Sequence, residues 1–296
     1  MKQAWIPFAS RPVPRYTSYP TAADFAPQVA EREARLWASQ TAPDKPISVY
    51  MHVPFCEKLC FYCGCATSVP NGYTRIAAYL ETLHREIDLW AASLGPHTGM
   101  AHLHFGGGSP NALSAQDFKD LVAHACRAFG LRPGAEIAVE IDPRGLTPDF
   151  IHAMAASGVT RVSFGVQTLS PKVQEAVGRI QPKVLLSEGI ERLQAAGIRA
   201  INMDLMYGLP DQTVSDVEEA AHFAAEMGAA GIAFDPATIK AEPQTGSFPR
   251  RGFGLYLIRL IVDEFVDHRP RGHLREARDL LGGRSEPSAL KTLPTN

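Results

Sequence analysis

Four cysteines that lie close together are the residues whose types and spacing could most clearly do chemistry. Cys56, Cys60, Cys63 and Cys65 follow the spacing C-x3-C-x2-C-x-C, and the fifth cysteine, Cys126, is remote from them. A structural zinc site usually takes its ligands from two C-x2-C knuckles, and the sequence has no second knuckle. Three thiolates in one short loop fit three irons of a [4Fe–4S] cluster, whose fourth iron would stay open for a substrate or cofactor. A zinc loop or a set of free thiols is the alternative.

Composition limits the classes of protein that could carry this loop. The chain has 296 residues, of which 45% are hydrophobic and 20% charged, with a formal net charge of −2, so a disordered chain, a coiled coil and a collagen-like fibre are excluded. No apolar run reaches the roughly 18–20 residues of a membrane helix, and the Pro- and Arg-rich start lacks the apolar core of a secretory signal. We therefore expect a cytoplasmic protein without a disulfide framework.

Short apolar runs alternate with helical patterns on both sides of the cysteine loop. The expected strands are Ile47–Val53, Ala101–Phe105, Glu136–Ile141, Thr160–Phe164, Ala200–Met206 and Gly231–Phe234. The expected helices are Glu31–Ser39, Tyr73–Ser93, Ser114–Phe129, Thr147–Ser157, Pro171–Val177, Val184–Ala196 and Val214–Met227. Six such alternations predict a parallel α/β sheet with right-handed crossovers.

Polar and glycine-rich segments follow these expected strands at the points where the strands end. Besides the cysteine loop, the segments are Gly106–Pro110, Glu140–Pro143, Gly165–Gln167 and Asp204. A site built at the carboxyl ends of successive strands is typical of α/β barrels. The sequence thus predicts a partial barrel of about six β/α units rather than an open doubly wound sheet.

The cysteine spacing with its flanks resembles the radical S-adenosylmethionine (SAM) superfamily, whose signature is C-x3-C-x-Φ-C, and Tyr62 takes the aromatic position. Within that superfamily the chain resembles the oxygen-independent coproporphyrinogen III oxidases. The matching segments are VPRYTSYPTA (13–22), YMHVPFC (50–56), CGC (63–65), HFGGGSP (104–110), VEIDPR (139–144), SFGVQ (163–167) and DLMYGLP (204–210). Their order and spacing match over roughly residues 11–235.

This resemblance implies roles for individual residues. Cys56, Cys60 and Cys63 would hold the cluster, whereas Cys65 would be a non-ligand with access to the site. The residues that would bind two SAM molecules are Tyr50, Gly107 and Glu140 for the first, and Tyr62, Gly108, Ser109, Gln167, Arg179 and Asp204 for the second. From the residues alone, Gly106–Gly108 could instead be a plain turn, Glu140 a partner of Arg144, and Arg179 a solvated surface charge.

The resemblance also implies a reaction and partners. The enzyme would be a radical SAM oxidoreductase that converts the propionates on rings A and B of coproporphyrinogen III into vinyl groups without oxygen, giving protoporphyrinogen IX for haem biosynthesis. Cys65 and Tyr19 are candidates for a catalytic role, and no residue is assigned one. The tetrapyrrole is anionic, so Arg11, Arg15, Arg144 and Arg179 are candidates to line the mouth of the site. We expect a monomer that takes electrons from a flavodoxin or ferredoxin and binds neither nucleic acid nor membrane.

The resemblance stops at about residue 235. We expect an N-terminal arm at 1–45, a radical SAM partial barrel at 46–235, and a divergent segment at 236–296 that lacks the family's C-terminal domain. A short natural form and a shifted reading frame would both give such an end. Two alternative functions stay open: a haem-binding chaperone of the same superfamily, and a protein that binds SAM and a cluster without turnover. Chaperone relatives typically lack the fourth cysteine and the Tyr-Thr-Ser-Tyr-Pro arm (16–20), and both are present here.

Overall fold

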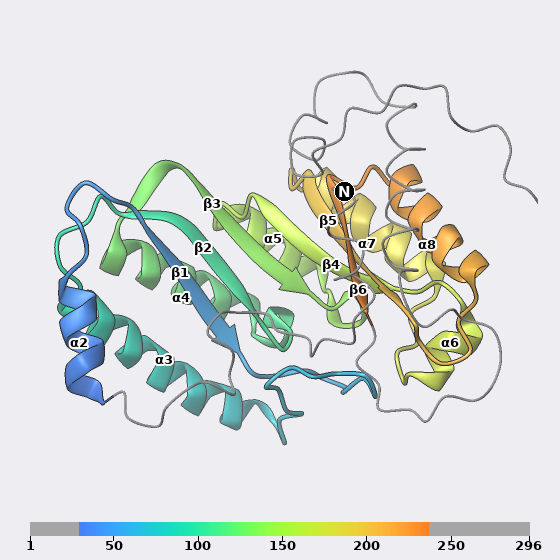
Figure 1. Ribbon diagram of the computed structural model, residues 1–296, viewed down its shortest axis with the longest axis horizontal. Helices are drawn as coiled ribbons and strands as arrows, with labels where there is room; N and C mark the ends of the chain where they lie inside the picture. Colours follow the sequence, from blue (N-terminus) through green and yellow to red (C-terminus); the bar gives the residue numbers. More distant parts are fainter. Residues whose placement is uncertain (1–29, 237–296) are drawn as a thin grey trace, which may run out of the picture. The chain divides into compact units, whose positions relative to one another are not determined.

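The described sheet consists of six parallel strands in the order β1-β2-β3-β4-β5-β6 (Figure 1). The computed structural model describes residues 30–236, all of them within the unit Ala26–Glu242. The strands are β1 Ile47–Val53, β2 Met100–Gly107, β3 Leu131–Ile141, β4 Arg161–Gln167, β5 Ala200–Tyr207 and β6 Gly231–Pro236. Because each strand pairs with the next one along the chain, the sheet has no reversal of strand order of the kind found in doubly wound folds. The expected partial-barrel arrangement is confirmed.

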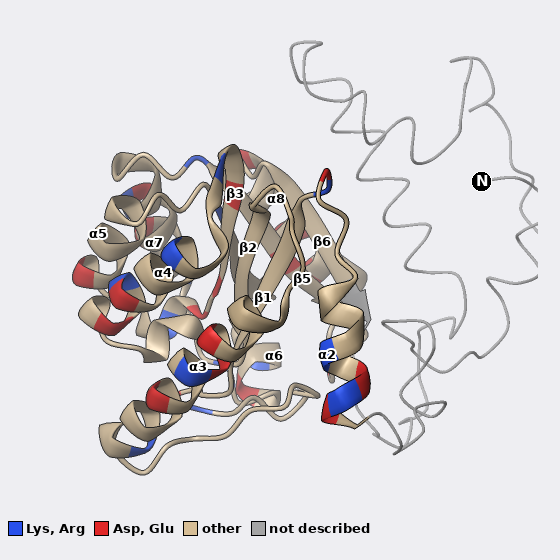
Figure 2. Ribbon diagram, turned by 90° about the vertical axis from the view of Figure 1, so that its left-hand side faces the viewer, with Lys and Arg blue, Asp and Glu red and all other residues tan. Residues whose placement is uncertain are grey.

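Helices connect successive strands and cover the sheet. They are α2 Glu31–Ser39, α3 Tyr73–Ser93, α4 Ala115–Phe129, α5 Pro148–Ala156, α6 Pro171–Ala176, α7 Lys183–Ala195 and α8 Val214–Glu226, with short 3-10 turns η3 Pro110–Ala112 and η4 Pro143–Gly145. N-cap residues set the starts of α4 and α5. The side chain of Ser114 accepts a hydrogen bond from the backbone N–H of Asp117, and that of Thr147 accepts one from the backbone N–H of Phe150. The charged residues gather on the helices, whereas the strands are mostly uncharged (Figure 2).

The hydrophobic core lies between the sheet and the helices. Phe105 on β2 contacts Phe118 on α4 at 5.2 Å between ring centroids, and Phe118 contacts Phe150 on α5 at 4.9 Å. All three rings are buried. This packing fixes the helices against the strands, and it leaves the ends of the strands as the rigid base from which the loops project.

All of the strands except β1 extend further than the sequence pattern predicts, and β3 and β4 show this clearly. β3 begins at Leu131 rather than at Glu136, and β4 continues to Gln167 rather than ending at Phe164. Hydrogen bonds from a neighbouring strand hold Gly165 and Gln167 in β4, although glycine and glutamine do not show the apolar pattern of a strand. The register shifts between these residues, and Gln167 has a φ of 63°. The end of β4 is therefore irregular at the point where the site begins.

Several expectations fall on residues that the structure does not describe. Arg11, Arg15 and Tyr19 lie outside the described residues, as do the Tyr-Thr-Ser-Tyr-Pro arm (16–20) and the segment after residue 236. The expected domain boundaries stay predictions. Among the described helices, none has both the length and the apolar character needed to cross a membrane.

Candidate active site

The predicted site residues meet in one cavity of about 150 Å³ at the carboxyl ends of the strands. The predicted residues that line it are Cys56, Cys60, Tyr62, Cys63, Cys65, Gly107, Gly108, Ser109, Glu140, Gln167, Arg179 and Asp204. They come from the loop after β1, from the ends of β2, β3 and β4, and from within β5, and Arg179 comes from the connection between α6 and α7. Residues far apart in the sequence are thus brought together as the parallel topology requires, and their individual roles stay predictions.

Backbone hydrogen bonds hold the cysteine loop at its start and in its middle. The N–H of Cys56 donates to the carbonyl of Ser68 (3.1 Å), and the N–H of Phe61 donates to the carbonyl of Val177 (2.9 Å). Within the loop, the N–H of Cys63 donates to the carbonyl of Cys60 (3.1 Å). The loop therefore has a defined path, which keeps its four thiols around one cavity.

The thiols differ in their ease of ionisation. A hydrogen bond from Cys65 lowers the pKa of Cys63 to about 6, and the same bond together with burial raises the pKa of Cys65. Burial also raises the pKa of Cys56. At neutral pH Cys63 is thus a thiolate and Cys65 a thiol. Thiolates are the metal-binding form of cysteine, and the division of these thiols into ligands and a non-ligand stays a prediction.

The glycine run at the end of β2 packs against the cysteine loop. The N–H groups of Gly108 and Ser109 donate to the carbonyls of Val53 (2.8 Å) and Phe55 (2.7 Å). A Cβ atom at Gly108 would lie 2.5 Å from the Phe55 carbonyl oxygen, and Gly107 has a φ of 107°. Only glycine allows this backbone conformation and this close approach. The contact of this run with SAM stays a prediction.

Glu140 lies at the end of β3 and contacts β2. Its carboxylate accepts hydrogen bonds from Nε2 of His104 (3.0 Å) and from the N–H of Gly107 (3.3 Å). The side chain remains 43% exposed, so its oxygens can still accept hydrogen bonds from a ligand. The alternative pairing of Glu140 with Arg144 is wrong, because Arg144 pairs with Asp142 at 2.6 Å.

Arg179 is buried, so the alternative that it is a solvated surface charge is wrong. Its guanidinium donates to Sγ of Cys60 (3.3 Å), to the carbonyl of Gly165 (2.9 Å) and to Oε1 of Gln181 (3.0 Å). It also pairs with Asp142 at 3.3 Å. Burial raises the pKa of Asp142, but the hydrogen bonds from Arg144 and the charge of Arg179 outweigh this effect and lower the pKa below its ordinary value. Asp142 is therefore a carboxylate at neutral pH.

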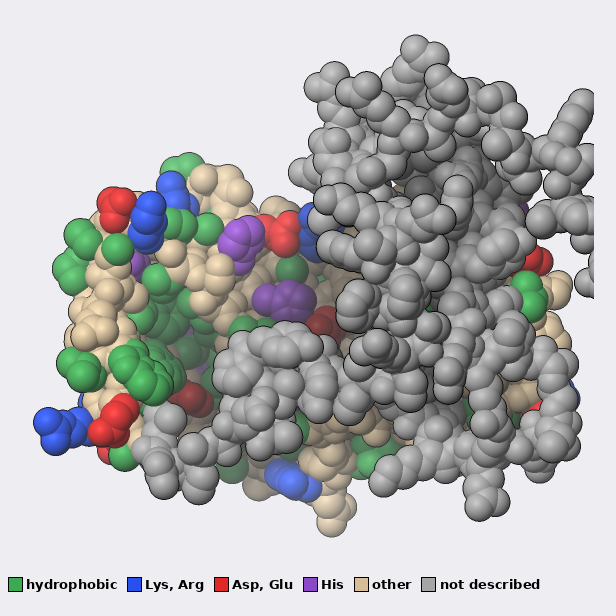
Figure 3. Space-filling view, in the orientation of Figure 1, with side chains coloured by type: hydrophobic (Ala, Val, Ile, Leu, Met, Phe, Trp, Pro, Cys, Tyr) green, Lys and Arg blue, Asp and Glu red, His purple; other side chains and the backbone are tan. Residues whose placement is uncertain are grey.

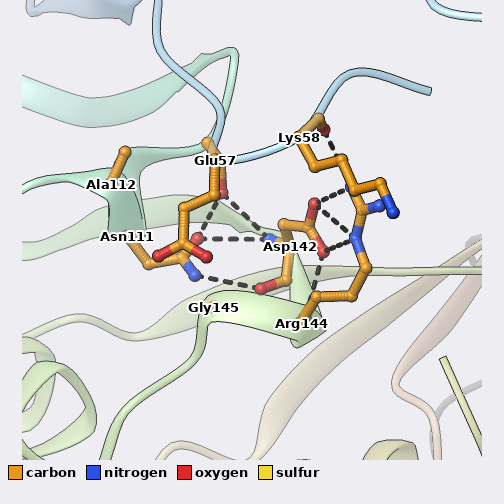
Figure 4. A pocket seen from close by; sticks show the side chains of 8 residues that line it. Glu57, Lys58, Asn111, Ala112, Asp142, Arg144 and Gly145 are labelled. Carbon is orange, nitrogen blue, oxygen red and sulfur yellow. Dashed lines mark hydrogen bonds and ion pairs between the residues drawn. The ribbon is translucent and has the colours of Figure 1, made fainter. Parts of the chain in front are cut away.

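Arg144 and Asp142 also line a second, smaller cavity of about 130 Å³ that adjoins the site (Figure 4). In this view Asp142 lies between Arg144 and Asn111, and Arg144 reaches the backbone of Lys58 in the cysteine loop. Nδ2 of Asn111 donates to the carbonyl of Asp142 (2.9 Å). Asp142 has no role predicted from the sequence. It directly follows β3 and lies two residues after Glu140, and this position is the signal that could have identified it.

Two other predicted residues have distinct surroundings. Asp204 accepts a hydrogen bond from the hydroxyl of Ser163 (2.7 Å), another residue in the cavity that the sequence analysis did not assign. Tyr62 packs against an apolar cluster that includes Val173 and Met206, and burial raises its pKa. Tyr62 is therefore a neutral aromatic group beside the cysteines.

Tyr50 is the predicted site residue that does not line the main cavity. It is 55% exposed and lies in a separate cavity of about 480 Å³ between β1 and α3. Its ring stacks on His104 at 5.7 Å, and its hydroxyl bonds Nδ1 of His52 (3.1 Å). Figure 3 shows hydrophobic and histidine side chains gathered on the face that carries β1 and β2. Tyr50 is thus connected to Glu140 through His104.

The cysteine loop offers the thiols that an iron–sulfur cluster needs. Cys56, Cys60, Cys63 and Cys65 are free thiols, and all four line the cavity beside the glycine backbone at the end of β2. Each cysteine ligand of such a cluster binds a different iron, so three of these thiols can serve a [4Fe–4S] cluster. Among the described residues, no group of three His, Cys, Asp or Glu side chains is placed to hold a single metal ion.

Comparison with known proteins agrees with this geometry. The sequence model of the radical SAM superfamily matches residues 50–224, more than half of the chain. The chain belongs to the radical SAM superfamily. Membership implies a [4Fe–4S] cluster and SAM as the cofactors of this radical SAM protein.

Several relatives of this radical SAM protein are named oxygen-independent coproporphyrinogen III oxidase. The protein from Bradyrhizobium diazoefficiens is 45% identical over 71% of this chain and 47% of its own length. The protein from Escherichia coli is 38% identical over 68% of this chain and 43% of its own length. The solved structure of coproporphyrinogen III oxidase (HemN) from Escherichia coli superimposes with a TM-score of 0.79 at 29% identity and covers 90% of this chain and 65% of its own. The chain spans about half the length of the curated relatives it matches.

Proposed function

We propose that this chain carries out the oxygen-independent oxidative decarboxylation of coproporphyrinogen III to protoporphyrinogen IX. The observation that carries the proposal is the meeting of Cys56, Cys60 and Cys63 with the glycine run and Glu140 in one cavity. The likeness to proteins of that name, at up to 45% identity, supports this choice of substrate. When bound, the cluster and SAM supply an electron and a 5′-deoxyadenosyl radical that takes a hydrogen atom from the β-carbon of a propionate.

In this proposal the residues of the chain hold and orient the cofactors. Cys56, Cys60 and Cys63 hold the cluster. The backbone at Gly107 contacts the methionine part of SAM, and the carboxylate of Glu140 accepts hydrogen bonds from the ribose hydroxyls. His104 keeps that carboxylate in place through its hydrogen bond of 3.0 Å. Each residue thus positions one part of the reacting molecule.

We further propose a second SAM molecule on the side of the cavity toward β4 and β5. Tyr62, Gly108, Ser109, Gln167, Arg179 and Asp204 are the residues proposed to face it, and all of them line the cavity. Cys65 lines it too, and its raised pKa keeps a thiol proton available there. Cys65 is accordingly the described candidate for a hydrogen or proton donor, and Tyr19 lies outside the described residues.

The propionates of the substrate need cations. Arg144 and Arg179 are engaged with Asp142 and Cys60, so we do not assign propionate binding to them. Arg11 and Arg15 remain the proposed cations and lie outside the described residues. We propose that the protein acts in the cytoplasm as a monomer and takes electrons from a flavodoxin or ferredoxin.

The test is an anaerobic assay of the reconstituted protein with dithionite, SAM and coproporphyrinogen III. Protoporphyrinogen IX together with 5′-deoxyadenosine is the expected result, and a Cys60→Ala variant should give neither product. If 5′-deoxyadenosine forms without a vinyl product, the proposed decarboxylation is wrong for this chain, although its use of SAM stands. Transfer of haem to a second protein without either product would indicate a chaperone instead.

A further inference from the structure

Cys60 differs from the other two proposed cluster ligands in its hydrogen-bond donors. Its Sγ accepts an N–H from Nη2 of Arg144 (3.4 Å) and another from Nη1 of Arg179 (3.3 Å). Sγ of Cys56 has the hydroxyl of Thr67 at 3.4 Å, and Cys63 has the thiol of Cys65. Two charged donors therefore act on Cys60, whereas neutral groups contact the other two sulfurs.

Asp142 holds both arginines in place. Its Oδ2 lies 2.6 Å from Nη2 of Arg144 and 3.3 Å from Nη1 of Arg179. The side chains of Arg144 and Asp142 are each 15% exposed, and that of Arg179 is 8% exposed. All three therefore have little freedom to turn away from one another. Carboxylate–guanidinium bonds are strong and directional, and they fix the planes of both guanidinium groups.

Backbone carbonyls fix the two arginines further. Arg144 donates to the carbonyls of Lys58 (3.1 Å) and Gly178 (3.4 Å), and Arg179 donates to that of Gly165 (2.9 Å). These contacts join the cysteine loop to the end of β4 and to the connection after α6. The donors are thus pre-organised toward Cys60 by parts of the fold that do not themselves bind the cluster.

The charges of this group add up to a net positive charge beside one sulfur. Two guanidinium groups and one carboxylate leave a net charge of about +1 in a largely buried place, where electrostatic interactions are stronger than in water. Reduction of a cluster adds one negative charge, which spreads over its sulfurs. Hydrogen bonds to the sulfurs and nearby positive charge favour the reduced form, and both raise the reduction potential.

We propose that Arg144 and Arg179, oriented by Asp142, are positioning residues that raise the reduction potential of the cluster through Cys60. They make the cluster easier to reduce, and so they ease the uptake of the electron that the reaction needs. This inference rests on the proposed ligation of the cluster by Cys56, Cys60 and Cys63.

The test is a redox titration of the reconstituted protein, followed by electron paramagnetic resonance, in the absence of tetrapyrrole. Arg144→Gln removes a positive charge and should lower the midpoint potential, whereas Arg144→Lys keeps the charge and should lower it less. Asp142→Asn removes a negative charge and should raise it. Arg161→Gln is the matched control, because Arg161 pairs with Glu136 at the opposite end of the sheet, and it should leave the potential unchanged.

The opposite signs separate an electrostatic role from a structural one. A merely structural group would shift the potential in the same direction in Arg144→Gln and Asp142→Asn, or shift it in neither, and either result would overturn the proposal. If Arg144→Gln does not assemble a cluster, Arg144→Lys and Asp142→Asn still decide the direction. Iron and sulfide are measured in every sample, so that absence of a cluster in the unaltered protein counts against the proposed ligation and not against the tuning.

Discussion

Gly107 lies directly against the ring of His52: a Cβ atom at Gly107 would be 2.3 Å from that ring. The His52 ring in turn bonds the carbonyl of Ala66 through Nε2 at 2.8 Å, next to the last cysteine of the loop. The end of β2, the end of β1 and the cysteine loop are therefore packed together through one glycine and one imidazole. A side chain at position 107 would disturb this packing and the loop beyond it.

Gly107→Ala should weaken SAM binding at least about tenfold, which corresponds to about 1.4 kcal/mol. The reason is that the new methyl group displaces His52 and changes the path of the loop. Equilibrium dialysis of SAM against the reconstituted protein measures the effect. Gly134→Ala is the matched control, since Gly134 also has a positive φ of 76° but has open space at its Cβ position. Equal affinities in the two variants would contradict the account.

Glu140→Gln should lower the affinity for SAM by about tenfold to a hundredfold, since a hydrogen bond to a charged group contributes about 1.5–3 kcal/mol. The amide keeps the size of the side chain but loses the charge that the ribose hydroxyls are proposed to use. Glu136→Gln on the same strand is the control, because Glu136 pairs with Arg161 away from the cavity. Equal losses of SAM affinity in Glu140→Gln and Glu136→Gln would contradict the proposed role of Glu140.

Replacement of single cysteines should divide the five into two classes. Cys56→Ala, Cys60→Ala and Cys63→Ala should each lose most of the bound iron and sulfide, because each removes one cluster ligand. Cys65→Ala should retain the cluster, since Cys65 is the proposed non-ligand thiol, and Cys126→Ala on α4 should behave like the unaltered protein. Anaerobic iron and sulfide analysis gives the answer. A full complement in any of the first three variants would remove that residue from the ligand set.

The capping box at the start of α8 should make a pH-dependent contribution to stability. Oδ2 of Asp216 accepts hydrogen bonds from the N–H (2.7 Å) and hydroxyl (2.8 Å) of Thr213, and the N–H of Asp216 donates to Oγ1 of Thr213 (3.2 Å). Burial raises the pKa of Asp216, but the bonds from Thr213 outweigh it and lower the pKa below the ordinary 3.8. Because the folded pKa lies below the unfolded one, this stabilisation is present above 3.8 and is lost as the pH falls through the folded value.

Asp216→Asn should therefore lower the free energy of unfolding by about 0.5–1 kcal/mol at neutral pH, the size of a helix N-terminal charge effect. Thr213→Ala should lower it by about 1 kcal/mol, as loss of an N-cap does. The difference between Asp216→Asn and the unaltered protein should shrink as the pH falls below 3.8. Urea unfolding at neutral pH and at a pH below 3.8 measures this difference in the free energy of unfolding. Glu218→Gln is the control, because Glu218 lies on the exposed face of α8. A difference that does not change with pH would contradict the assigned charge effect.

Sequence pattern predicts local elements well where one face is apolar and the ends are marked. The strand Ile47–Val53 and the helix Tyr73–Ser93 agree with the structure at both ends. Strand ends also predict which residues meet, because parallel strands end at the same edge of a sheet. Most of the residues expected around the cysteines do line one cavity.

Contacts between distant segments are not encoded in such patterns. The bond from Arg179 to Cys60 joins residues 119 positions apart, and that from Arg144 to Cys60 joins residues 84 apart. The burial of Arg179 depends on Gly165 and Gln181, whose packing no periodicity reveals. The choice of Asp142 rather than Glu140 as the partner of Arg144 depends on the tight turn Pro143–Gly145 that follows β3.

The central claim is that a radical generated at this site takes a hydrogen atom from a propionate side chain. The most direct measurement uses coproporphyrinogen III deuterated at the β-carbons of its propionates, with mass spectrometry of the 5′-deoxyadenosine formed under anaerobic conditions. The account predicts that 5′-deoxyadenosine carries deuterium and that vinyl groups appear in proportion to it. Formation of 5′-deoxyadenosine without deuterium, in the presence of the labelled substrate, would contradict it.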